Sequence, residues 1–95
     1  MIVGLTQFSI HLPENRSLKG KRKIVRGLAD RIRARHRVSV AEVGAQDVHT
    51  VGELGFAVVG SDRTVVRSIV DEVLRTAVET CPAEIVDEEI EVMEW

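Results

Sequence analysis

The side chains that could support acid–base or metal chemistry are few and scattered. Five polar candidates fall on one predicted strand and around one predicted turn: His11, Gln46, Asp47, His49 and Glu53. No spacing among them matches a known ligand pattern, and no nucleophile has a base beside it. We therefore expect a non-enzymatic protein that needs no metal or cofactor. The sequence assigns no role to His11, Asp47, His49 or the final Trp95.

A second kind of chemistry is concentrated in one segment. Residues 16–37 read RSLKGKRKIVRGLADRIRARHR, which holds ten of the thirteen Lys and Arg residues and a single acid, Asp30. The last twenty residues hold seven acids and no base, so the formal net charge of −2 hides a strong polarity along the chain. The negative net charge argues against a polyanionic partner, but the positive charge of residues 16–37 is compatible with one.

Length and composition indicate one small domain, 1–95. The single cysteine, Cys81, excludes an intrachain disulfide and a CxxC motif. The N-terminal residues MIVGLTQFSIHL lack a charged leader, and no apolar run is long enough to span a bilayer. We expect a cytoplasmic protein without membrane contact.

Hydrophobic periodicity predicts six elements. The expected strands are residues 2–12, 37–43, 53–60 and 83–94, and the expected helices are 17–35 and one that starts at Ser61 or Asp62 and stops before Pro82. The acids of the last strand favour a sheet edge, whereas the apolar strand 53–60 favours the middle. The order β-α-β-β-α-β predicts an α+β, ferredoxin-like fold: a four-stranded antiparallel sheet with two helices on one face.

At about 100° per residue, helix 17–35 divides into a core stripe and a charged flank. The stripe contains Leu18, Val25, Leu28, Ala29, Ile32 and His36. The flank, which we call the basic ridge, contains Lys19, Arg22, Lys23, Arg26, Arg33 and Arg37. Like charges in a row repel one another, so a polyanion is the partner that this pattern favours. A plain solvated face and pairing with the acidic last strand of a partner chain are the alternatives.

The start of the same helix is a second candidate. Arg16, Lys19 and Lys21 cluster where free backbone N–H groups and the positive end of the helix dipole would favour a phosphate. Together with the basic ridge, this predicts eight nucleic-acid-binding residues: Arg16, Lys19, Lys21, Arg22, Lys23, Arg26, Arg33 and Arg37.

The other face of the sheet is not suited to base stacking. The residues expected on this face are Gln7, Ser9 and His11 of strand 2–12 and Gly55, Ala57 and Val59 of strand 53–60. Both Phe residues alternate with these and so are expected to face the core, and the chain has no Tyr. Val3, Leu5, Gly55, Ala57 and Val59 make this open face small and apolar. We therefore expect a homo-oligomer that packs through it.

Four segments together resemble one family across nearly the whole chain: MIVG, HLP followed by SLKxKR, RVSVAEV and ELGFAVVG. The sequence is similar to the YlxP-like family, domain of unknown function 503. The resemblance implies a small bacterial protein with a ferredoxin-like fold, encoded near genes of transcription elongation, translation initiation and ribosome maturation. It also implies that many relatives have Glu at the position of Gly20, where a Ser-x-x-Glu capping box would form.

These observations predict an RNA- or ribosome-associated accessory protein that binds the phosphate backbone through helix 17–35. The alternative is an oligomeric interaction or regulatory module whose basic ridge docks on an acidic protein surface.

Overall fold

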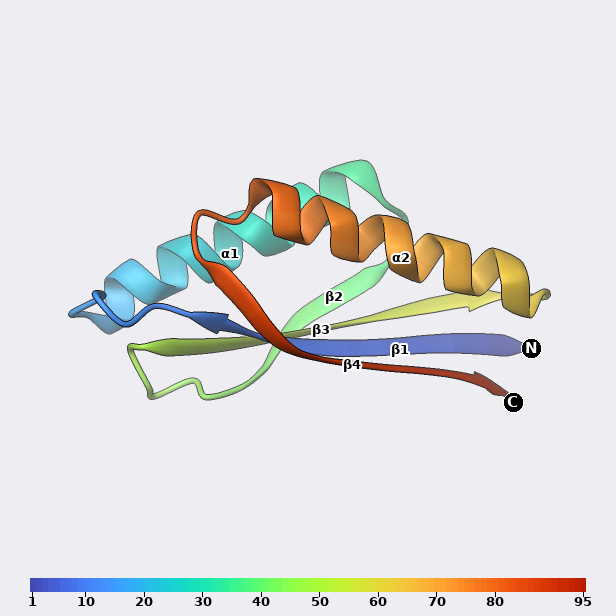
Figure 1. The fold of residues 1–95 in the computed structure, drawn as a ribbon, viewed down its shortest axis with the longest axis horizontal. Coiled ribbons are helices and arrows are strands. Elements are labelled where there is room, and N and C mark those ends of the chain that lie inside the picture. The colour runs from blue at the N-terminus through green and yellow to red at the C-terminus, as the bar shows by residue number, and fades with distance from the viewer.

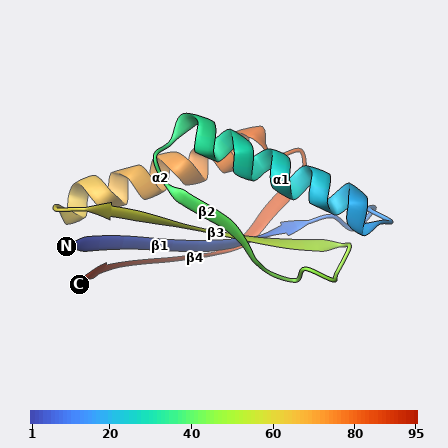
Figure 2. The same ribbon diagram turned by 180° about the vertical axis from the view of Figure 1, so that it is seen from behind.

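The computed structural model describes all residues, 1–95, and contains the six predicted elements in the predicted order. They are β1 (Ile2–His11), α1 (Leu18–Arg35), β2 (Ser39–Gly44), β3 (Val51–Gly60), α2 (Arg63–Thr80) and β4 (Glu84–Glu94). The strands form one sheet of order β2-β3-β1-β4, and every neighbouring pair is antiparallel. Both helices cover the same face of this sheet (Figure 1; Figure 2). The predicted ferredoxin-like fold is therefore confirmed.

The helix starts follow from their capping residues. Ser17 accepts a hydrogen bond from the N–H of Gly20, and Asp62 accepts one from the N–H of Val65. The central strand β1 and the edge strand β4 begin and end close to the residues predicted for them. The β3 strand begins at Val51, two residues before its predicted start, because the register with β1 continues to the pair His11–Val51. The turn between β2 and β3 is correspondingly shorter.

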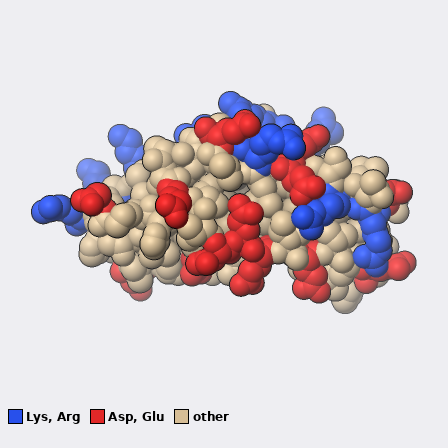
Figure 3. Space-filling model, viewed as in Figure 1, with Lys and Arg blue, Asp and Glu red and all other residues tan.

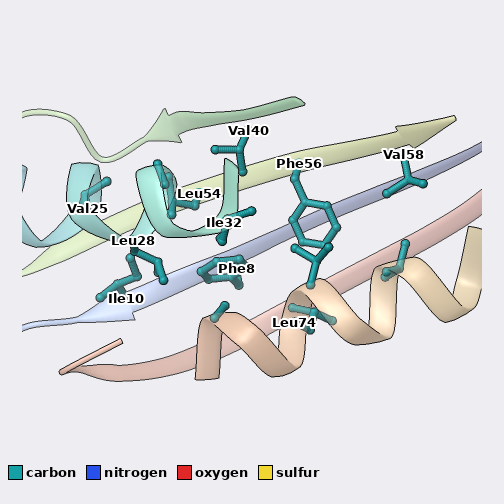
Figure 4. Close-up of a cluster of buried hydrophobic side chains, with 14 of the residues drawn as sticks. Phe8, Ile10, Val25, Leu28, Ile32, Val40, Leu54, Phe56, Val58 and Leu74 are labelled. Atoms are coloured by element: carbon teal, nitrogen blue, oxygen red, sulfur yellow. The ribbon is translucent and has the colours of Figure 1, made fainter. Parts of the chain in front are cut away.

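Strict alternation along β1 and β3 separates two faces. Even-numbered residues of both strands are buried under the helices, among them Phe8, Ile10, Leu54 and Phe56. Figure 4 shows Phe8 and Ile10 of β1 beside Leu28 and Ile32 of α1. The two helices bury a stripe of apolar side chains each, so one core lies between the helical layer and the sheet. Odd-numbered residues of β1 and β3 form the open face.

The topology also separates the charged elements. The helix α1 packs on β2 and β3, whereas α2 packs on β1, β3 and β4. The acidic strand β4 is at the opposite edge of the sheet from β2. Neither helix combines the length and the apolar character that crossing a membrane requires.

Candidate nucleic-acid interface

Five members of the basic ridge lie on α1 with exposed side chains. They are Lys19, Arg22, Lys23, Arg26 and Arg33. At about 1.5 Å of rise per residue, the span from Lys19 to Arg33 is about 21 Å along the helix axis. The ridge therefore presents a line of positive charge along most of α1.

Very little of this charge is neutralised within the chain. The protein has two ion pairs, and only Arg33 of the basic ridge takes part in one, with Asp30 at 3.2 Å. Arg33 also donates to the carbonyl oxygen of Val40 in β2 at 2.6 Å. That bond holds its guanidinium against the β2 edge. Lys19, Arg22, Lys23 and Arg26 have no acidic partner.

Three of the arginines meet at one hollow. A space of about 270 Å³ lies between α1 and the β2–β3 part of the sheet, and Arg22, Arg26 and Arg33 line it. Val25, Ala29 and Leu54 form its apolar wall. Glu42 of β2, half-buried, also lines the hollow and makes no ion pair with the arginines. The arginine cluster is thus the most concentrated positive feature of the ridge, and Glu42 is the one acid that lines the hollow.

Arg37 was predicted to continue the ridge, but it lies beyond the end of α1. The helix ends at Arg35, and His36 is its C-cap with φ −134° and ψ 143°. This extended backbone turns the chain toward β2, so the helical wheel no longer describes Arg37. Its side chain is exposed, but it belongs to the connection between α1 and β2.

Lys21 was predicted to bind phosphate, and the structure contradicts this. Its side chain is fully buried, and its ammonium group donates to the carbonyl oxygens of Ala45 at 2.5 Å and Gln46 at 3.1 Å. Lys21 lies one helical turn before Val25, on the core stripe, so it points toward the sheet and not toward solvent. The helical spacing could have identified it, but its charge suggested a surface role.

The start of α1 is also less open than predicted. Arg16 and Lys19 are exposed there, as expected. However, the side-chain amide of Asn15 donates to the carbonyl oxygens of Ser17 at 2.7 Å and His49 at 2.5 Å. A Cβ on Gly20 would lie 2.6 Å from the side-chain oxygen of Asn15. Glycine at this position therefore leaves room for Asn15 to tie the helix start to the β2–β3 turn.

The polar residues considered for catalysis do not converge. No three His, Cys, Asp or Glu side chains group so as to bind a metal ion. The side chains of His11 and His49 are exposed. The ring of His36 contacts the hydroxyl of Thr76 in α2 at 2.7 Å, which makes it a link between the two helices. The half-buried Cys81 is the C-cap of α2.

Charge is distributed unevenly over the surface. Figure 3 shows acidic side chains where β4 runs and basic side chains at the end of the molecule where α1 begins. The sheet order thus keeps the basic helix α1 away from the acidic strand β4.

Comparison with known proteins identifies a family and a fold. The family model described as "Protein of unknown function (DUF503)" matches residues 3–90. No curated protein matches the sequence. A designed protein with a ferredoxin fold, LFR1 1, is similar in structure, with a TM-score of 0.57, 13% identity, and coverage of 95% of this chain and 84% of the other. The designed protein Foldit4 has a TM-score of 0.52 at 10% identity and covers 99% and 97%. At these identities the likeness concerns the fold alone.

Proposed function

Since this chain belongs to the family of proteins of unknown function DUF503, we propose a function from its own charges: it binds the phosphate backbone of RNA through the basic ridge of α1. In this proposal the protein is a binding factor and not an enzyme. The observation that carries it is a row of exposed cations of which only Arg33 has an acidic partner.

The dimensions of the ridge suit several phosphates at once. A line of about 21 Å, most of which the arginine cluster covers, could meet roughly three to five of them. Guanidinium groups bind phosphate oxygens through paired N–H donors, so Arg22 and Arg26 are the residues that we expect to contribute most. Arg33 contributes a charge already fixed in place by Val40.

Base recognition is not part of the proposal. The residues of β1 and β3 on the open face include Gln7, Ser9, Gly55 and Ala57, and none of these provides an aromatic ring for stacking. Phosphate contacts position a nucleic acid but carry little sequence information. We therefore expect binding that varies little with base sequence.

The test is filter binding of total ribosomal RNA at low salt by the wild type and two double variants. Arg22→Glu with Arg26→Glu reverses two charges on the ridge. Arg67→Glu with Arg75→Glu makes the same change in net charge on exposed positions of α2. The ridge variant should bind at least tenfold more weakly, and the α2 variant should lose much less.

Two results would count against the proposal. Equal losses in both variants would mean that only net charge matters. No binding by the wild type would remove RNA as the partner and favour the docking of the ridge on an acidic protein surface.

A further inference from the structure

The open face of the sheet exposes more apolar surface than a solvent-facing sheet normally does. Leu5 is 42% exposed, Val43 49% and Val59 65%. Met1 and Trp95 exchange backbone hydrogen bonds at the end of the β1–β4 pair, and alternation places both on this face. Both are exposed, Trp95 by 81%.

The centre of this face is hollowed. An open depression of about 530 Å³ is lined by residues of all four strands, including Leu5, Val43, Gly55 and Ala57. Gly55 has no side chain, and a Cβ there would lie 3.1 Å from a methyl group of Val43. The face therefore has a low region on β3 beside a higher region on β1.

The register places this difference in height in two neighbouring pairs at the centre of the face. Leu5 of β1 is paired with Ala57 of β3, and Gln7 is paired with Gly55. In each pair the larger side chain is on β1 and the smaller is on β3. Such a surface is complementary to the same surface of a second copy, provided that β1 of each copy lies over β3 of the other.

We propose that a second copy of this chain packs on the open face, with a twofold axis parallel to the strands that passes between β1 and β3. Such an axis places β1 of one copy over β3 of the other. Leu5 then opposes Ala57 of the second copy, and Gln7 opposes Gly55. Two sheets packed face to face lie about 10 Å apart with interdigitated side chains, which this alternation of large and small residues allows.

The charges on the face favour the same axis. Glu89 and Glu91 of β4 lie beside the hollow, whereas β2 contributes Ser39 and Ala41 there. Because the axis is parallel to the strands, β4 of one copy faces β2 of the other, and Glu91 faces Ser39, which is in the same row of the register. A twofold axis across the strands would instead place β4 over β4, so the acids would face one another.

The area of the open face approaches that of a standard protein–protein interface. Three strands of ten or eleven residues and the six-residue β2, spaced about 4.8 Å apart, make a face of at most roughly 19 by 33 Å. Its projected area is roughly 600 Å², and side-chain relief makes the accessible area larger. A standard interface buries about 800 Å² on each partner.

Sedimentation equilibrium of the full chain over a concentration series tests the proposal. The wild type should approach twice its mass of 10.5 kDa. Leu5→Glu and Ala57→Glu should each weaken the dimer at least tenfold. The control is Val78→Glu on the outer face of α2, where the valine is 56% exposed, and it should dimerise like the wild type.

The direction of the axis has a test of its own. Ser39→Lys should strengthen the dimer because the lysine meets Glu91 of the second copy, and Ser39→Glu should weaken it. Circular dichroism confirms that each variant is folded, and Leu5 is exposed enough to be replaced without loss of the core. A monomeric wild type would overturn the proposal, as would a dimer that Leu5→Glu and Ala57→Glu leave unchanged. Equal effects of Ser39→Lys and Ser39→Glu would overturn the axis.

Discussion

The ammonium group of Lys21 donates to the carbonyl oxygen of Ala45 at 2.5 Å and joins α1 to the turn between β2 and β3. Ala45 has a positive φ of 54°, a conformation that residues other than glycine adopt infrequently. The lysine thus helps to hold a turn whose backbone is unfavourable in isolation. This positive charge of the 16–37 segment supports the fold and is not available to a ligand.

Replacing this lysine should therefore affect stability and not RNA binding. Lys21→Met keeps the unbranched shape of the side chain, one atom shorter, but leaves the carbonyls of Ala45 and Gln46 without their donor. This should lower the free energy of unfolding by about 1–3 kcal/mol. Its affinity for RNA should stay within about twofold of the wild type, well below the tenfold change that 1.4 kcal/mol represents. Urea unfolding and filter binding measure the two quantities.

The exposed Lys19 on the same helix provides the matched control. Lys19→Met should change stability by less than about 0.5 kcal/mol and should weaken RNA binding. If Lys21→Met weakened RNA binding more than Lys19→Met, the assignment of Lys21 to the fold would be wrong.

Gly20 and Asn15 should be energetically coupled. Alanine has a helix propensity about 1 kcal/mol better than glycine, but in the wild type its Cβ would displace the Asn15 side chain from its two carbonyl partners. Gly20→Ala should therefore raise the free energy of unfolding little in the wild type, and by about 1 kcal/mol in an Asn15→Ala background. A double-mutant cycle of urea unfolding measures the coupling. Equal effects in both backgrounds would show that Asn15 does not determine the choice of glycine.

Gly4 of β1 lies directly against two valines of α2. A Cβ there would lie 2.9 Å from methyl groups of both Val66 and Val70, which are fully buried. Gly4→Ala should destabilise the protein by about 1–3 kcal/mol through overpacking. Val66→Ala should lower the free energy of unfolding less in the Gly4→Ala background than in the wild type. The reason is that the methyl group added by Gly4→Ala fills part of the cavity that Val66→Ala leaves. Strict additivity in thermal or urea unfolding would contradict this contact.

Much of the architecture could be predicted because its causes are local in sequence. The alternation through Phe8 and Ile10, the caps at Ser17 and Asp62, and the acids of β4 are all visible in the sequence. The roles of individual cations were harder to predict. Lys21 reaches carbonyls 24 and 25 residues away, and Arg33 reaches Val40 only after the chain has turned at His36. The helical spacing places Lys21 on the core stripe, but the carbonyl acceptors of these bonds are set by tertiary placement.

Glu42 provides a test in which binding should improve. Its carboxylate shares the hollow with Arg22 and Arg26, so it should repel a phosphate that enters there. Glu42→Gln keeps the shape of the side chain and should strengthen RNA binding by about twofold to tenfold at low salt, equivalent to about 0.4–1.4 kcal/mol. Glu72→Gln, an exposed position of α2, is the control and should have a smaller effect. Unchanged or weaker binding by Glu42→Gln would place the phosphate outside this hollow.

The salt dependence of RNA binding tests the account of the basic ridge most directly. Each phosphate contact on a single strand contributes about −0.7 to the slope of log K against log salt, so three to five contacts predict a slope of roughly −2 to −3.5. Arg22→Glu with Arg26→Glu should flatten that slope by about 1.4, the contribution of two contacts. Arg67→Glu with Arg75→Glu should leave it nearly unchanged. A wild-type slope near zero, or equal slopes for the wild type and the ridge variant, would contradict the claim that α1 binds the phosphate backbone.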